Sequence, residues 1–153
     1  KYRDALSGVR QPALFAYEMP TPPQNEGRHY SQEEIRYYGT SKAYQTRWDK
    51  VQAERTKNYA DLLEAEALWG EELNKLFSKL YGLEHELFIT VRQYLDLMNP
   101  ETPTATKDAV EKIRRNKRDI LYDDLSEEPD EFKKDIKNAM EQIESYLKPK
   151  LMR

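Results

Sequence analysis

Apolar side chains recur at every third or fourth position between residues 41 and 98, which is the spacing of one face of an α-helix. No proline interrupts this stretch, and Asn99-Pro100 ends it. At Gly70 a narrow apolar stripe becomes a broad apolar face, and a glycine inside a helix costs about 1 kcal/mol relative to alanine. The pattern therefore predicts one very long helix with a kink or a break near Gly70.

Two shorter amphipathic segments follow, at residues 102–125 and 126–150. Their apolar positions, expected to be buried, are Val110, Ile113, Ile120, Leu121 and Leu125 in the first and Phe132, Ile136, Met140, Ile143 and Leu147 in the second. We expect Ser126 to open the last helix. Short connections predict that these helices pack as antiparallel neighbours. The fold class is therefore all-α, an elongated antiparallel helical bundle.

The first 30 residues have a different pattern. Residues 1–10 are long enough for two helical turns, and four prolines between residues 12 and 23 then favour an extended path. Ser31 and Glu34 form a capping box that starts a helix, which we expect to end at Gly39. We thus divide the chain into an extended, Pro-rich N-terminal arm at 1–30 and a helical bundle domain at 31–153.

Composition limits the functions that this chain can have. Charged residues make up 35% of it, and 25 basic and 28 acidic side chains are well mixed, so no nucleic acid is expected as a partner. The absence of cysteine excludes thiol catalysis and disulfides. Because the sequence begins at Lys1 and not at methionine, we expect a processed product or a part of a longer chain. It therefore stays open whether an upstream segment brings the chain close to a membrane.

Catalytic signatures are also missing from the sequence. A di-metal helical bundle needs glutamate three residues before histidine, but Gly82 occupies that position before His85. No glycine-rich phosphate loop and no nucleophile elbow occurs. The many acidic residues still allow a pair of carboxylates to act as general acid and base, although no particular pair stands out in the sequence. We expect no enzyme, no cofactor and no metal site.

Two clusters remain as candidate sites. Large aromatic side chains with a polar tip are enriched at protein interfaces. The partner-binding candidates of this kind are Phe15, Tyr17, Tyr37, Tyr38, Tyr44 and Trp48. We expect the arm around Phe15 and Tyr17 to dock near Tyr44 and Trp48, with the exposed remainder facing a partner. The alternative is that all of these aromatic residues form ordinary core.

The second cluster is the basic run at 112–118. On a helix, Arg114, Arg115 and Arg118 would share one face and could bind an anion such as a phosphate. The alternative is a solvated helix face balanced by nearby aspartates. Together these features favour a non-enzymatic protein-interaction domain with a scaffold, adaptor or regulatory role. Its partner is expected to be another protein or a second copy of the chain. A helical small-molecule sensor, or contact of the basic run with anionic lipid or nucleic acid, is the alternative.

Overall fold

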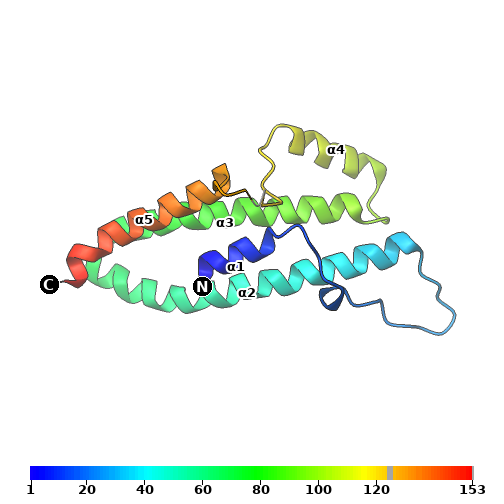
Figure 1. Cartoon of the computed structure of the whole chain (residues 1–153), viewed down its shortest axis with the longest axis horizontal. Coiled ribbons are helices and arrows are strands. Elements are labelled where there is room, and N and C mark those ends of the chain that lie inside the picture. Colours follow the sequence, from blue (N-terminus) through cyan, green and yellow to red (C-terminus); the bar gives the residue numbers. More distant parts are fainter. Residues whose placement is uncertain (124–125, 153) are drawn as a thin grey trace.

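The structure is a computed structural model that describes residues 1–123 and 126–152. It consists of the helices α1 (Tyr2–Val9), α2 (Gln32–Trp69), α3 (Glu71–Met98), α4 (Thr104–Arg115) and α5 (Glu131–Leu151), with a short 3-10 helix, η1, at Ala16–Glu18. No strand occurs among the described residues. The chain is an all-α bundle that is elongated along α2 and α3 (Figure 1).

The expected single long helix is two helices that lie side by side. The break falls at Gly70, where φ is 83°, a left-handed conformation that glycine adopts without steric cost. The Gly70 N–H donates to the carbonyl of Glu66 at 2.8 Å and closes the last turn of α2. α2 and α3 therefore form an antiparallel hairpin, with Gly70 at its tip (Figure 1).

The start of α2 agrees with the sequence, but its course past Gly39 does not. The Ser31 hydroxyl accepts from the Glu34 N–H at 3.1 Å, and the Glu34 carboxylate accepts from the Ser31 N–H at 2.7 Å. α2 then continues through Gly39, so the helix end expected there is wrong. A Cβ at Gly39 would lie 3.1 Å from the Cβ of Met19. The glycine therefore allows the arm to approach α2 closely.

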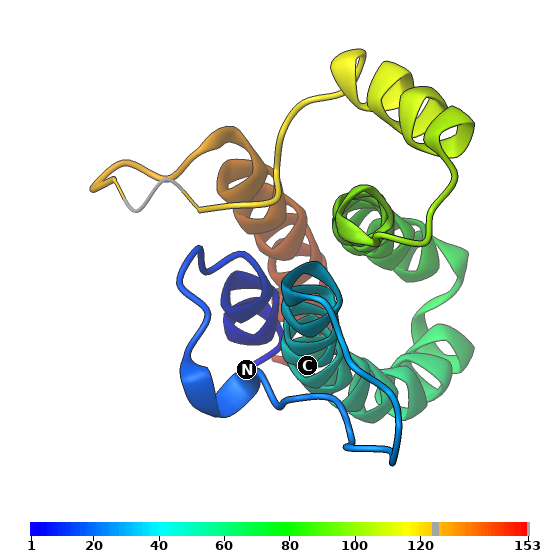
Figure 2. The same ribbon diagram turned by 90° about the vertical axis from the view of Figure 1, so that its right-hand side faces the viewer.

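The core joins α1, α2, α3 and α5. Figure 2 shows α1 beside α2, and α4 on the outer side of α3. Tyr2–Val9, which the sequence placed in the arm, forms α1 and contributes three buried side chains to the core: Tyr2, Leu6 and Val9. The extended segment thus begins only after α1, and it is interrupted by η1.

The segment between α3 and α5 is less helical than the sequence predicts. α4 ends at Arg115, and Ile113 is 48% exposed, while Ile120 and Leu121 are buried from a non-helical segment. Leu125 lies outside the described residues. The buried Arg10 side chain anchors this non-helical segment, because it donates to the carbonyl oxygens of Ile120 and Tyr122.

The last helix begins four residues later than expected. Asp130, and not Ser126, is its N-cap, and the Asp130 carboxylate accepts from the Lys133 N–H at 2.9 Å. Phe132, Ile136 and Ile143 are buried against α3 and α1, as their spacing predicts.

Candidate interaction surface

The arm is fixed to α2 by one buried arginine, Arg47. Its Nε and Nη2 donate to the two carboxylate oxygens of Glu18 at 2.8 and 2.9 Å. Nη1 donates to the carbonyl of Gln11 at 2.8 Å, and Nη2 donates to that of Ala13 at 2.7 Å. These hydrogen bonds from Arg47 lower the pKa of the Glu18 carboxyl against the opposing effect of burial. We name this contact the Arg47 clamp.

The Arg47 clamp holds an exposed pair of aromatic rings. Phe15 and Tyr17 stack on each other with ring centroids 5.5 Å apart, and they are 48% and 84% exposed. The Phe15 N–H donates to the Glu18 carboxylate at 3.0 Å, so the clamp also orients this turn. The arm around Phe15 and Tyr17 thus lies against α2 at Arg47, between Tyr44 and Trp48 in the sequence, but the two rings themselves are exposed. Polar contacts to Arg47 hold the turn, and the rings face outward.

Two of the remaining aromatic candidates, Tyr44 and Trp48, pack within the hairpin. Tyr44 is 2% exposed and meets the Tyr94 ring edge-on at 6.0 Å, and burial raises the pKa of Tyr44 to about 12. Trp48 packs on Phe88 at 5.1 Å. Tyr37 and Tyr38 are half-buried near the start of α2. The structure thus separates the six candidates into an outward pair, two residues that join α2 to α3, and two half-buried residues near the start of α2.

A small apolar cavity of about 250 Å³ lies beside Trp48, between α2 and α3. Ser41 and Trp48 both line it, and the Ser41 Oγ and Trp48 Nε1 atoms are buried without a hydrogen-bond partner among the described residues. Such donors are the groups that would orient a ligand in an otherwise apolar site.

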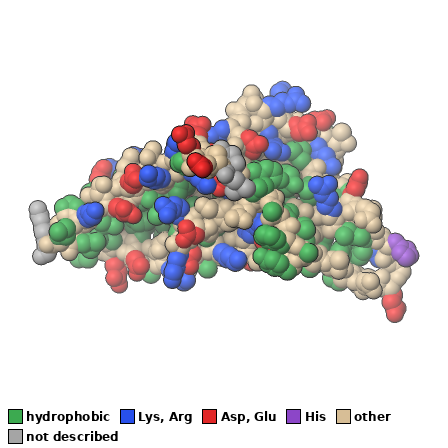
Figure 3. Space-filling model, in the orientation of Figure 1, with side chains coloured by type: hydrophobic (Ala, Val, Ile, Leu, Met, Phe, Trp, Pro, Cys, Tyr) green, Lys and Arg blue, Asp and Glu red, His purple; other side chains and the backbone are tan. Residues whose placement is uncertain are grey.

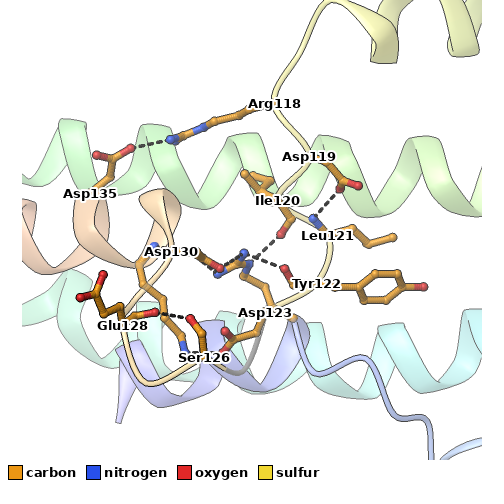
Figure 4. Close-up of polar contacts among 12 residues, drawn as sticks. Arg118, Asp119, Ile120, Leu121, Tyr122, Asp123, Ser126, Glu128, Asp130 and Asp135 are labelled. Atoms are coloured by element: carbon orange, nitrogen blue, oxygen red, sulfur yellow. Dashed lines mark hydrogen bonds and ion pairs between the residues drawn. The ribbon is translucent and has the colours of Figure 1, made fainter.

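The basic run is divided between structural and surface roles. Arg114, Arg115 and Arg118 line one depression of about 330 Å³ between α3 and α4, as the sequence suggested. However, Arg118 lies beyond the end of α4, where it donates to Asp135 at 2.6 Å (Figure 4). It also donates to Glu86 at 2.8 and 3.0 Å. Its hydrogen bonds to Glu86 are the main cause of its raised pKa. Arg118 therefore joins α3 to α5.

Besides Arg47, the sequence analysis missed the buried polar side chains of Arg10 and Glu84. Arg10 donates to the carbonyls of Ile120 and Tyr122, at 2.6 and 2.9 Å. It also forms a bidentate ion pair with Asp130, which is labelled together with these two residues in Figure 4. Glu84 accepts hydrogen bonds from the Tyr2 hydroxyl and from Arg55. Glu84 stands between Leu80 and Leu87 in the apolar stripe of α3, and that position is the signal that could have identified it. Arg10 has no comparable signal.

No protein-family model, no curated protein and no solved structure matches this chain. Among the described residues, no group of three or more potential metal ligands occurs, and none of the helices is both long and apolar enough to cross a bilayer. A function for the chain therefore has to follow from its own surfaces.

Proposed function

We propose that this chain is a non-enzymatic protein-interaction domain, and that the stacked Phe15–Tyr17 pair binds a protein partner. The observation that supports this function is the combination of exposure and fixed geometry. Both rings are open to solvent, yet the turn that carries them is tied to α2 by the Arg47 clamp. A partner therefore meets rings that are already in place, so less conformational entropy is lost on binding.

Aromatic residues that enter a pocket on a partner dominate the binding energy of many interfaces. The surface beside this pair is hollowed, with a depression of about 570 Å³ between α1, the arm and α2. Its rim carries both signs of charge, including Lys50 and Glu54. The pair and the depression together give a partner both an apolar anchor and a polar rim, which is the usual anatomy of an interface.

Affinity capture with the full chain tests this function. Proteins retained by the wild type are compared with those retained by a Phe15→Ala/Tyr17→Ala variant and by a Tyr59→Ala control, which removes an exposed ring from another part of α2. We expect the double variant to keep its helix content by circular dichroism and to lose at least one partner that the control retains. Identical sets of captured proteins would exclude the Phe15–Tyr17 pair as the binding surface.

The cavity beside Trp48 supports a small-molecule sensor as the second candidate, because it presents two unpartnered polar groups in an apolar wall. A thermal-shift screen of small aromatic carbonyl compounds would test it. Stabilisation should be lost in a Trp48→Phe variant, which keeps an aromatic ring and removes the indole N–H. The basic run offers less support for an anion site, since the Arg118 guanidinium is occupied by Glu86 and Asp135.

A further inference from the structure

A large apolar groove lies near the tip of the hairpin, away from the Phe15–Tyr17 pair. It has a volume of about 570 Å³ and runs between α2, α3 and α5. Buried Leu62, Leu73 and Leu80 are part of its lining, and Leu68, which is 74% exposed, stands at its edge. Hydrophobic side chains appear along this end of the molecule in Figure 3. We name this feature the hairpin groove.

The hairpin groove continues the space that α1 occupies. Tyr2, the first residue of α1, lines the groove, and α1 runs from there beside α2, away from the hairpin tip (Figure 1). α1 buries Tyr2, Leu6 and Val9, at spacings of four and three residues. The helices that form the groove thus already bind one amphipathic helix, α1, next to it. The part of α2 that lines the groove, from Asn58 to Trp69, corresponds to a helix of about three turns, or roughly 18 Å.

Charge at the edge of the groove selects the kind of helix that fits. Asp61, Glu64 and Glu144 line it and are exposed, and none of them forms an ion pair with another described residue. No lysine, arginine or histidine occurs among the described residues that line it. An acidic edge around an apolar floor is complementary to a helix with an apolar stripe flanked by lysine or arginine. It repels the headgroups of anionic lipids and the carboxylate of a fatty acid.

We propose that the hairpin groove binds a cationic amphipathic helix of a partner protein. The apolar stripe of that helix lies on Leu62, Leu73 and Leu80, and its basic side chains pair with the three carboxylates at the edge. This site is independent of the Phe15–Tyr17 pair, so a partner could bind either surface alone.

A labelled synthetic peptide tests the proposal directly. The probe is a 14-residue helix with leucine at positions i, i+3, i+4 and i+7 and lysine at the flanking positions; one control peptide scrambles this order, and another replaces lysine with glutamate. Fluorescence anisotropy is measured with the full chain at physiological salt. We expect saturable binding of the probe and at least tenfold weaker binding of both control peptides.

Variants of the chain locate the binding. Asp61→Lys/Glu64→Lys reverses two edge charges that make no ion pair, and Leu68→Ser removes an exposed apolar contact. Each change should weaken the binding of the probe peptide at least tenfold without loss of helix content. A matched control, Glu33→Lys/Glu101→Lys, makes the same change in net charge at exposed positions far along the chain and should leave the affinity within twofold. Phe15→Ala/Tyr17→Ala should also leave it unchanged, which separates this site from the proposed function.

Three results would overturn the proposal. Equal binding of the probe and of the scrambled peptide would show attraction by net charge alone. A dimer of the wild type that Asp61→Lys/Glu64→Lys abolishes, measured by sedimentation velocity, would assign the groove to a second copy of the chain. Binding to vesicles of zwitterionic lipid that Leu68→Ser abolishes would assign it to a lipid surface.

Discussion

The two halves of α2 differ in what covers them. Up to about Arg55, the helix lies under the arm and α1, and every buried residue of α2 except Leu62 falls at or before Val51. Beyond Asn58, α2 borders the open hairpin groove. The three large apolar side chains of α2 that are exposed all lie in this second half: Tyr59, Leu63 and Leu68. One helix thus has a closed half and an open half.

The difference shows how a largely polar helix is held in a fold. In the closed half, a charged side chain of α2 holds the covering arm in place, because Arg47 donates hydrogen bonds to one carboxylate and two carbonyl groups of the arm. In the open half, apolar side chains have no matching cover within the described residues. The closed half therefore serves the fold and positions the aromatic pair, and the hairpin groove beside the open half is the surface that we propose for a partner helix.

Two tyrosines on α2 give the largest contrast. Tyr44→Ala removes a buried ring that packs on Tyr94, and we expect a loss of about 3–5 kcal/mol in the free energy of unfolding. Tyr59→Ala removes a ring that is 54% exposed in the open half, and the change should stay within about 0.5 kcal/mol. Urea denaturation followed by circular dichroism measures both. Equal midpoints would mean that the two halves are covered alike.

Removal of the Arg47 clamp should give a smaller loss. Arg47→Met deletes hydrogen bonds to three partners and leaves the half-buried Glu18 carboxylate without its guanidinium partner. Release of the arm limits the cost to about 1–3 kcal/mol. We expect faster proteolysis between residues 11 and 30, with α2 and α3 intact. Arg36→Met, at an exposed position of α2, is the control and should match the wild type. Unchanged cleavage of the Arg47 variant would mean that the arm is held by other contacts.

Two glycines inside helices, Gly39 in α2 and Gly82 in α3, allow the effect of one added methyl group on stability to be compared at a covered and an uncovered position. Gly82→Ala adds a Cβ with no neighbour within 4 Å and should stabilise the fold by about 0.5–1 kcal/mol. Gly39→Ala adds a Cβ only 3.1 Å from Met19, so displacement of the arm should cancel that gain. Thermal denaturation of both variants measures the difference. A similar gain at Gly39 would show that the arm yields without cost.

The smallest expected change is a pH dependence from one carboxyl group. Arg47 holds the pKa of Glu18 below its usual range, so the carboxylate stabilises the fold above the unfolded-state pKa of about 4.3. This contribution is lost as the pH falls from there through the folded-state pKa. Glu18→Gln should therefore flatten the decline in unfolding free energy below about pH 4.3. An unchanged slope would remove Glu18 from the acid response.

Local patterns in the sequence predicted the helices well. The Ser31–Glu34 capping box depends on neighbouring residues, and the apolar spacing of Phe132, Ile136 and Ile143 depends only on the period of a helix. Both features are therefore visible without the fold. The break at Gly70 was visible as well, but not the reversal of direction, because that depends on which faces then pack together.

Tertiary polar contacts could not be predicted in the same way. Arg10 reaches segments about 110 and 120 residues away and anchors the non-helical segment that follows α4. The exposure of Phe15 and Tyr17 follows from Arg47, whose charge suggests a surface position in the sequence. Its place between Tyr44 and Val51, on the apolar face of α2, was the available signal. The hairpin groove was not predicted, since it requires the position of α5 relative to α2 and α3.

Amide hydrogen exchange along α2 tests the distinction between the closed and open halves most directly. Amides of residues 43–51, which lie under the arm and α1, should exchange only with opening free energies close to global unfolding. Amides of residues 58–68 beside the hairpin groove should exchange through smaller local openings, and the cationic peptide should slow them selectively. Uniform protection along α2, unchanged by the peptide, would contradict the division of this helix into a covered half and a half that is open to a partner.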